Sequence, residues 1–177
     1  MKVGIISDTH GFWDEKYEYY LGECDEIWHA GDIGSMEVAD RFEAMRPRFR
    51  AVYGNIDDYE MRLRYPEILR FKAEDTDVLI KHIGGYPGHY DLSIRNTILY
   101  SPPQLFVSGH SHILRIMLDK SLGLLHVNPG AAGLSGWQKD RTIVRLTIEG
   151  NKFTDCEMVV LGQRSQVQHS TPDEENI

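Results

Sequence analysis

Residues 3–10 read Val3-Gly4-Ile5-Ile6-Ser7-Asp8-Thr9-His10, an apolar run rich in β-branched side chains that ends in polar residues. Such a run is typical of a buried strand, so we predict a strand over residues 3–7. The pattern then alternates: helices are predicted over residues 12–21 and 35–45, and strands over residues 26–29 and 49–53. This β-α-β-α-β order predicts a mostly parallel sheet covered by helices.

The second half of the chain is dominated by strand patterns. One helix is predicted over residues 91–100, where Pro102 and Pro103 end it. Strands are predicted over residues 68–73, 78–82, 105–108, 113–118, 124–127, 142–148 and 152–160, the last two joined by a turn at residues 149–151. We therefore expect an α/β fold with two packed, mostly mixed sheets and helices outside. Residues 1–162 form the expected domain, and residues 163–177 are expected to be a flexible tail.

The composition is typical of a globular domain, with 41% hydrophobic and 26% charged residues in a chain of 177. The formal net charge of -8 disfavours nucleic acid as a partner, because duplex-binding proteins usually carry a basic face. Two stretches lack Asp, Glu, Lys and Arg, but both contain Pro and several Gly or His, so neither predicts a membrane span. Asp8 interrupts the first apolar run, which therefore does not resemble a signal peptide. We expect a cytoplasmic protein.

Six short polar motifs lie at predicted strand ends, which is where α/β sheets bind their ligands. In chain order they are Asp8-Thr9-His10, Gly31-Asp32, Gly54-Asn55, His82, Gly109-His110-Ser111-His112 and Asn128-Pro129-Gly130. The glycines would let the backbone turn or approach closely just before a ligand. Two carboxylates, four imidazoles and one amide can hold two divalent cations if one carboxylate bridges them. Nitrogen and oxygen donors without thiolate suit manganese, iron, nickel or zinc, and magnesium less well.

Most of these motifs, taken alone, have an ordinary structural explanation. Asp8 could cap a following helix, Asp32 or Asn55 could be a turn residue, and His82 could be a hydrogen-bonded core histidine. The pair His110 and His112 differs, because two histidines one residue apart after a buried strand are more often metal ligands than not. The ordered set as a whole therefore favours a metal site.

The ordered set resembles the calcineurin-like metallophosphoesterase superfamily. The short length and the loop at residues 128–130 resemble its small bacterial and archaeal phosphodiesterase branch. The resemblance covers residues 1–160 and implies a four-layer α/β/β/α sandwich with a dinuclear site at the C-terminal ends of the strands. It implies one metal held by Asp8, His10, Asp32 and His112, and a second held by Asp32, Asn55, His82 and His110. It also implies catalytic roles for Asp32, Asn55 and His110. Manganese is the metal we expect, with iron, nickel, zinc and magnesium as alternatives.

The reaction implied by this resemblance is hydrolysis of a small phosphate-ester substrate, above all a diester, with a metal-bridging hydroxide as nucleophile. Many larger relatives carry a histidine directly after the Gly-Asn pair, where it donates a proton to the leaving group. Ile56 occupies that position here, so we expect esters with good leaving groups to react best. His89 is an alternative donor, although a surface-loop histidine is the better interpretation.

Two other functions remain open at this point. A phosphomonoesterase or nucleotidase would use the same two metals. A protein-binding scaffold is the alternative from a different class, because a retromer subunit with this fold has a degraded metal site. All seven ligand positions keep coordinating side chains here, which favours an enzyme. An oligomer is compatible with the sequence, and a membrane partner is not expected.

Overall fold

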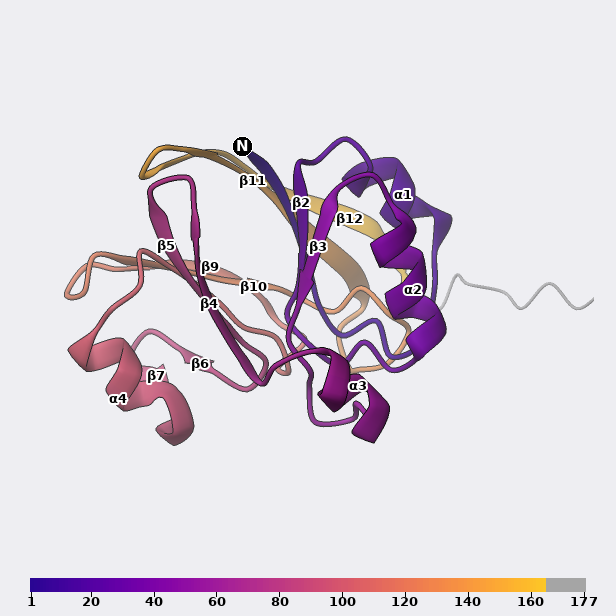
Figure 1. Cartoon of the computed structure of the whole chain (residues 1–177), viewed down its shortest axis with the longest axis horizontal. Coiled ribbons are helices and arrows are strands. Elements are labelled where there is room, and N and C mark those ends of the chain that lie inside the picture. Colours follow the sequence, from indigo (N-terminus) through magenta and orange to yellow (C-terminus); the bar gives the residue numbers. More distant parts are fainter. Residues whose placement is uncertain (165–177) are drawn as a thin grey trace, which may run out of the picture.

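The computed structural model describes residues 1–164, which form two five-stranded sheets with helices on their outer sides (Figure 1). The first sheet has the order β12-β11-β1-β2-β3, formed by Lys152–Gln163, Asp140–Glu149, Lys2–Ile6, Glu26–His29 and Arg48–Ala51. The second has the order β4-β5-β8-β10-β9, formed by Ile68–Ala73, Thr76–Lys81, Leu105–Val107, Leu124–Pro129 and Leu114–Asp119. The predicted tail lies outside the described residues from residue 165 onward.

The remaining elements are four helices and a short hairpin within the described part of the chain. The helices are α1 (Glu15–Leu21), α2 (Met36–Ala44), α3 (Tyr59–Arg64) and α4 (Leu92–Tyr100). The hairpin pairs β6 (Gly85–Tyr86) with β7 (His89–Tyr90). In Figure 1, α1, α2 and α3 lie at one end of the molecule and α4 at the other, with the sheets between them. No helix within residues 1–164 is long and apolar enough to cross a membrane.

The alternation of side chains along each strand produces three apolar layers. In β1, Val3 and Ile5 point into the core between the two sheets, while Ile6 packs under α1 and α2. In the second sheet, Val78 and Ile80 face the same inter-sheet core. Their neighbour Leu79 instead packs with Phe106 against α4, through Ile94 and Ile98. Helix, sheet, sheet and helix therefore follow one another, which confirms the four-layer sandwich.

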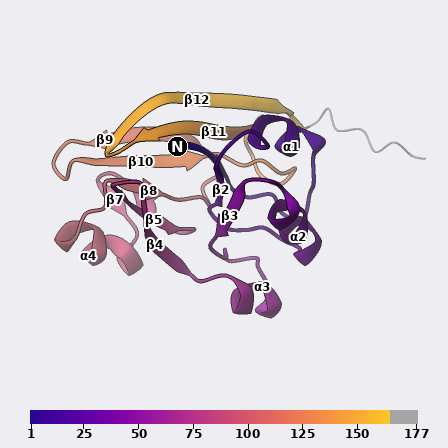
Figure 2. The same cartoon turned by 45° about the horizontal axis from the view of Figure 1, so that its top comes forward.

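Three adjacent strands in each sheet are parallel, and this arrangement positions the site. β1, β2 and β3 run parallel in the first sheet, and β5, β8 and β10 run parallel in the second. The antiparallel strands lie outside these parallel strands: β4 and β9 flank them in the second sheet, and the long β11 and β12, which extend across one side of the molecule, follow β1 in the first (Figure 2). The C-terminal ends of parallel strands meet at one edge of a sheet, so each sheet presents three loops at such an edge.

Three local predictions need correction. The first helix begins at Glu15 and not at residue 12, because Asp14 is its N-cap and accepts a hydrogen bond from the Lys16 amide. The sequence patterns missed α3, which has six residues and buries only Met61. They also missed the β6–β7 hairpin, whose strands have two residues each, too few to show alternation. The other predicted helices and strands are confirmed, with ends shifted by a few residues.

Candidate metal centre

The seven predicted ligands come together at the C-terminal ends of the parallel strands. Asp8 and His10 follow β1, Asp32 follows β2 and Asn55 follows β3. From the second sheet, His82 directly follows β5, and His110 and His112 follow β8. The two sheets therefore contribute to one site, although its outermost members are 104 positions apart in the sequence (8 to 112).

The first group of side chains consists of Asp8, His10 and His112, whose ligand atoms all lie within 4.8 Å of one another. His112 Nε2 is 3.0 Å from Asp8 Oδ1, and His10 Nε2 is 3.8 Å from the same oxygen. The two imidazole rings lie edge to face, with centroids 5.3 Å apart. Asp8 is fully buried and both histidines are partly buried, so this group lies inside the protein surface.

The second group consists of Asp32, His82 and His110, again with ligand atoms within 4.8 Å of one another. His82 Nε2 is 3.2 Å from Asp32 Oδ2 and 3.1 Å from Asn55 Oδ1, so Asn55 belongs to this group as well. The His82 and His110 rings lie edge to face at 5.3 Å. Asp32 and His82 are buried, whereas Asn55 and His110 are exposed.

One carboxylate oxygen connects the two groups. Asp32 Oδ2 is 3.2 Å from His82 Nε2 in the second group and 3.5 Å from His10 Nε2 in the first. A carboxylate that faces a histidine of each group from a single oxygen has the position of a bridging ligand. The other Asp32 oxygen, Oδ1, accepts a hydrogen bond from the Ile56 amide, which fixes the orientation of the carboxylate.

The donor atoms of the site fit cations better than they fit one another. Asp8 Oδ1 and His10 Nε2 are buried and have no hydrogen-bond partner among residues 1–164. The His82 Nδ1–H group donates to the carbonyl of Ala30 at 2.7 Å, so in the neutral ring Nε2 carries the lone pair that could bind a cation. That lone pair faces two further oxygen acceptors, on Asp32 and Asn55. Buried lone pairs that converge without donors are what a divalent cation requires, so the residues present fit two such ions.

The backbone of the site is held in an uncommon conformation. Five of the seven ligands have positive φ angles, namely Asp8 (55°), His10 (49°), Asp32 (55°), His110 (66°) and His112 (58°). The left-handed region is unfavourable for residues with a Cβ, and it persists only where the surrounding structure enforces it. Such strain concentrated on the predicted ligands is typical of a functional site.

The carboxylates and imidazoles shift one another's pKa values. Burial acts to raise the pKa of Asp8, but the nearby imidazoles of His10, His112 and His82 hold it well below its ordinary range. The pKa of Asp32 is likewise lowered, because its contacts with His82 outweigh burial. Burial acts to lower the pKa of His82, yet the Asp32 and Asp8 carboxylates raise it above its ordinary value. The two carboxylates therefore stay ionised at neutral pH and can bind cations.

Sequence reasoning missed a second layer of residues that fix the ligand loops. Asp57 is buried, and its carboxylate accepts hydrogen bonds from the amides of Ile33 (3.2 Å), Gly34 (2.8 Å) and Gly54 (2.7 Å). These amides lie next to Asp32 and Asn55 in the chain, so Asp57 joins two ligand loops. The signal was its place after the Gly-Asn pair, but two of its three partners are backbone amides 23 and 24 positions earlier.

The segment 128–130, at the C-terminal end of β10, also acts as a brace. Asn128 donates from Nδ2 to the Gly109 carbonyl at 2.8 Å and to Ser111 Oγ at 3.1 Å. Its Oδ1 accepts from the Gly130 amide at 3.0 Å. The sixth predicted motif therefore holds the loop that carries His110 and His112. The predicted role of the glycines is also seen, since a Cβ at Gly54 would overlap the Asp32 carboxylate.

Residues 1–151 match the model of the calcineurin-like phosphoesterase superfamily domain. The chain belongs to the calcineurin-like phosphoesterase superfamily. It is 25% identical over 145 residues to phosphodiesterase MJ0936 of Methanocaldococcus jannaschii, an alignment that covers 73% of this chain and 83% of the relative. The resemblance on which the ligand set was predicted is therefore confirmed.

Solved structures with this superfamily fold include an archaeal phosphodiesterase and a sorting protein. The archaeal phosphodiesterase is 23% identical, with a TM-score of 0.71, over 91% of this chain and 100% of that one. Wild-type Vps29 of Entamoeba histolytica, solved in complex with Zn²⁺, is 17% identical with a TM-score of 0.71, over 90% of this chain and 99% of that one. At these identities the likeness establishes the fold of the phosphoesterase domain and leaves its activity to be argued from the site.

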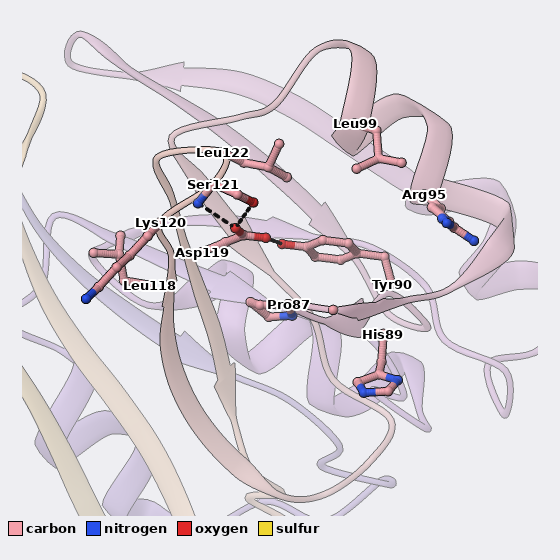
Figure 3. Close-up of a pocket in the computed structure, with 11 residues that line it drawn as sticks. Pro87, His89, Tyr90, Arg95, Leu99, Leu118, Asp119, Lys120, Ser121 and Leu122 are labelled. Atoms are coloured by element: carbon pink, nitrogen blue, oxygen red, sulfur yellow. Dashed lines mark hydrogen bonds between the residues drawn. The ribbon is translucent and has the colours of Figure 1, made fainter.

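The phosphoesterase domain also has a cavity away from the candidate metal centre. A space of about 700 Å³ lies between α4, the β6–β7 hairpin and the turn after β9 (Figure 3). The Asp119 carboxylate at its centre accepts hydrogen bonds from Tyr90 Oη and from Ser121, as the dashed lines in Figure 3 show. Neighbouring protein groups thus already hydrogen-bond with the Asp119 carboxylate, and none of the predicted ligands lines this cavity.

Proposed function

We propose that this chain is a metal-dependent phosphodiesterase with a dinuclear site. The observation that carries the proposal is the Asp32 oxygen that faces His10 at 3.5 Å and His82 at 3.2 Å, one histidine from each ligand group. The superfamily and the relative named a phosphodiesterase support the same reaction class. Asp8, His10, Asp32 and His112 would hold one cation, and Asp32, Asn55, His82 and His110 the other.

Two divalent cations at these groups would supply an activated water and a positive clamp for phosphate oxygens. The protein's own contribution is position and charge. Asp8 and Asp32 provide only two negative charges for two divalent ions, so the loaded centre keeps a net positive charge that attracts a phosphate ester. Asn55 and His110 are the exposed members of the set, and their side chains are therefore placed to contact substrate oxygens. Asp32 fixes the separation of the two groups.

We further propose manganese as the metal, with iron, nickel, zinc and magnesium as alternatives. Four imidazoles, two carboxylates and one amide form a donor set of intermediate hardness, which suits first-row transition metals better than magnesium. Metal analysis of the purified protein, followed by reconstitution with each ion, separates these alternatives.

The proposed reaction favours esters with good leaving groups. Ile56 follows Asn55 where larger relatives have a histidine, and its exposed side chain cannot donate a proton. His89 lies on β7 with an exposed ring that packs against Tyr86 at 5.0 Å. Because Ile56 cannot protonate the leaving group, we expect aryl diesters to be hydrolysed faster than alkyl monoesters.

The test is turnover of a bis-aryl phosphodiester and an aryl phosphomonoester with added Mn²⁺, by the wild-type protein and by Asp32→Ala. We expect the wild-type protein to hydrolyse the diester faster than the monoester. We expect Asp32→Ala to abolish diester hydrolysis. Faster monoester turnover would instead indicate a phosphomonoesterase or nucleotidase. Unchanged hydrolysis in Asp32→Ala, or fewer than one divalent ion bound per chain after reconstitution, would overturn the proposal.

The likeness to Vps29 keeps a protein-binding scaffold as the second candidate. In that case the protein would bind metal without measurable hydrolysis of any of these esters. The convergence of all seven coordinating side chains favours the enzyme, since a scaffold does not require a complete ligand set.

A further inference from the structure

Two cavities adjoin the second ligand group, and each is lined by different members of that group. One, here called the ring cavity, has a volume of about 200 Å³ and is lined by Ile83, Tyr86, His89, His110, Arg115 and His126, among others. The other, here called the charged cavity, has a volume of about 290 Å³ and is lined by Tyr53, Asn55, Arg62, Lys81, His82 and Ile83, among others. Ile83 lines both, so it stands between them. Each cavity contains at least one ligand of the second group.

This placement matters for the substrate because a phosphodiester has two ester arms and a monoester has one. The His82 and His110 rings are 5.3 Å apart, and each opens on a different cavity. A phosphorus atom held at the second group would therefore lie close to both cavities. Two arms that diverge from phosphorus could enter one cavity each, across Ile83.

The ring cavity has the shape and chemistry to hold a flat group. The Arg115 guanidinium carbon lies 3.7 Å from the Tyr86 ring centroid, so the cation rests on the face of the ring. The His89 ring packs against Tyr86 at 5.0 Å with a tilt of 45°. The buried His126 ring, held by Ser108 Oγ at 2.9 Å, adds a further planar surface. A cavity of about 150 Å³ is known to accept benzene, so the ring cavity has room for one aromatic ring.

The charged cavity differs in its chemistry. The Lys81 ammonium group is buried in it and pairs with Glu67. The Arg62 guanidinium donates to the carbonyls of Asp57 (2.8 Å) and Asn55 (3.3 Å) and lies 5.0 Å from the Tyr53 ring centroid. Its charged groups suit an arm that carries hydrogen-bonding groups, and they would penalise an aromatic ring through desolvation.

We propose that the substrate is a phosphodiester with a planar aromatic group on one arm, and that this arm binds in the ring cavity against Tyr86 and Arg115. The proposal rests on the proposed function, because the proposed metal centre would position the phosphate. Tyr86 and Arg115 are then specificity-determining residues, which bind the arm and leave the reacting atoms to the metal centre.

The experiment measures binding in place of turnover. Phenylphosphonate and methylphosphonate carry a carbon–phosphorus bond that the enzyme cannot hydrolyse, and they differ only in the arm. We expect the Mn²⁺-loaded protein to bind phenylphosphonate about fivefold or more tightly than methylphosphonate in calorimetric titrations. Tyr86→Leu and Arg115→Ala should bring this ratio close to one, whereas Tyr86→Phe should preserve it.

The matched control is Arg70→Ala. Arg70 lies exposed on β4 and pairs with Asp77, so its removal should leave the ratio unchanged. A ratio near one in the wild-type protein, or a ratio that survives both Tyr86→Leu and Arg115→Ala, would overturn the proposal. The two hypotheses fail separately. If the protein preferred phenylphosphonate but did not hydrolyse diesters, only the proposed function would be overturned. If it hydrolysed diesters but showed no such preference, only the proposed role of the ring cavity would be overturned.

Discussion

The two ligand groups share Asp32 but differ in their surroundings. In the first group the fully buried Asp8 is 3.0 Å from His112, and neither cavity described above is lined by Asp8, His10 or His112. The second group has an exposed amide and an exposed imidazole, and it opens on both cavities. We infer from this difference that the proposed first cation would be held tightly and that the proposed second cation would meet the substrate.

The largest expected effect is the loss of activity on removal of a second-group ligand. His82→Ala should lower kcat/KM for a bis-aryl diester by at least about 1000-fold, because the cation that faces both cavities loses an imidazole. A calorimetric titration of the metal-free protein with Mn²⁺ should show two steps, of which His82→Ala removes the weaker. His10→Ala should remove the tighter step. A single step of two equal sites in the wild-type protein would contradict the contrast between the groups.

A large effect on stability is expected at the brace of the first group. Arg141 is almost fully buried, donates to the Ala132 carbonyl (2.7 Å) and to Asp14 (2.6 Å), and lies against the Phe12 ring at 4.9 Å. It thus ties the loop that follows His10 to the loop after β10. Arg141→Ala should reduce the free energy of unfolding by about 3 kcal/mol, because Asp14 would lose its buried partner.

The control for this effect lies on the same strand. Arg145 pairs with Glu157 at the surface, so Arg145→Ala should change the free energy of unfolding by less than about 1 kcal/mol. Urea unfolding of both variants in the presence of a chelator measures the difference without a contribution from bound metal. Equal effects of the two variants would show that Arg141 does not brace the site.

The stability of the protein should also depend on pH, through His126, one of the residues that line the ring cavity. Burial lowers the pKa of His126 to about 4 from its ordinary 6.5. Because the folded state holds this histidine neutral, its contribution is complete above the unfolded pKa of about 6.5 and declines as the pH falls towards the folded value. Between about pH 7 and pH 4.5 the protein should lose roughly 2–3 kcal/mol of stability through this group.

Comparison with His126→Phe isolates the contribution of His126, since the other titrating groups remain. Urea unfolding at both pH values with a chelator present should show a smaller loss in His126→Phe than in the wild-type protein. Equal losses would mean that the imidazole does not titrate differently in the folded and unfolded states.

The same contrast explains how much could be predicted from the sequence. The two packed sheets and the positions of the candidate ligands were visible in local patterns, because an apolar strand followed by Asp8 or Asp32 can be recognised within ten residues. The four-layer order and the division of the candidate ligands between two metals were implied only by the family resemblance. The braces could not be predicted in that way. Arg141 meets Asp14 across 127 positions, and Asp57 meets backbone amides that no side-chain pattern reveals. The two cavities depend on side chains from several strands, so they too required the three-dimensional arrangement.

The smallest of these effects is expected at Asp57, and it tests the second group most directly. The Asp57 carboxylate accepts three backbone amides beside Asp32 and Asn55. In Asp57→Asn the amide NH₂ group would face at least one of these donors, so the loops would lose part of their alignment. We expect Mn²⁺ to bind about tenfold more weakly in the second calorimetric step. The first step should weaken less, because Asp8, His10 and His112 lie on other loops and only Asp32, of its four candidate ligands, lies on a loop that Asp57 holds. If Asp57→Asn weakened only the first step, the assignment of the steps would be reversed. The tighter cation would then belong to the second group, and the weaker cation to the buried first group.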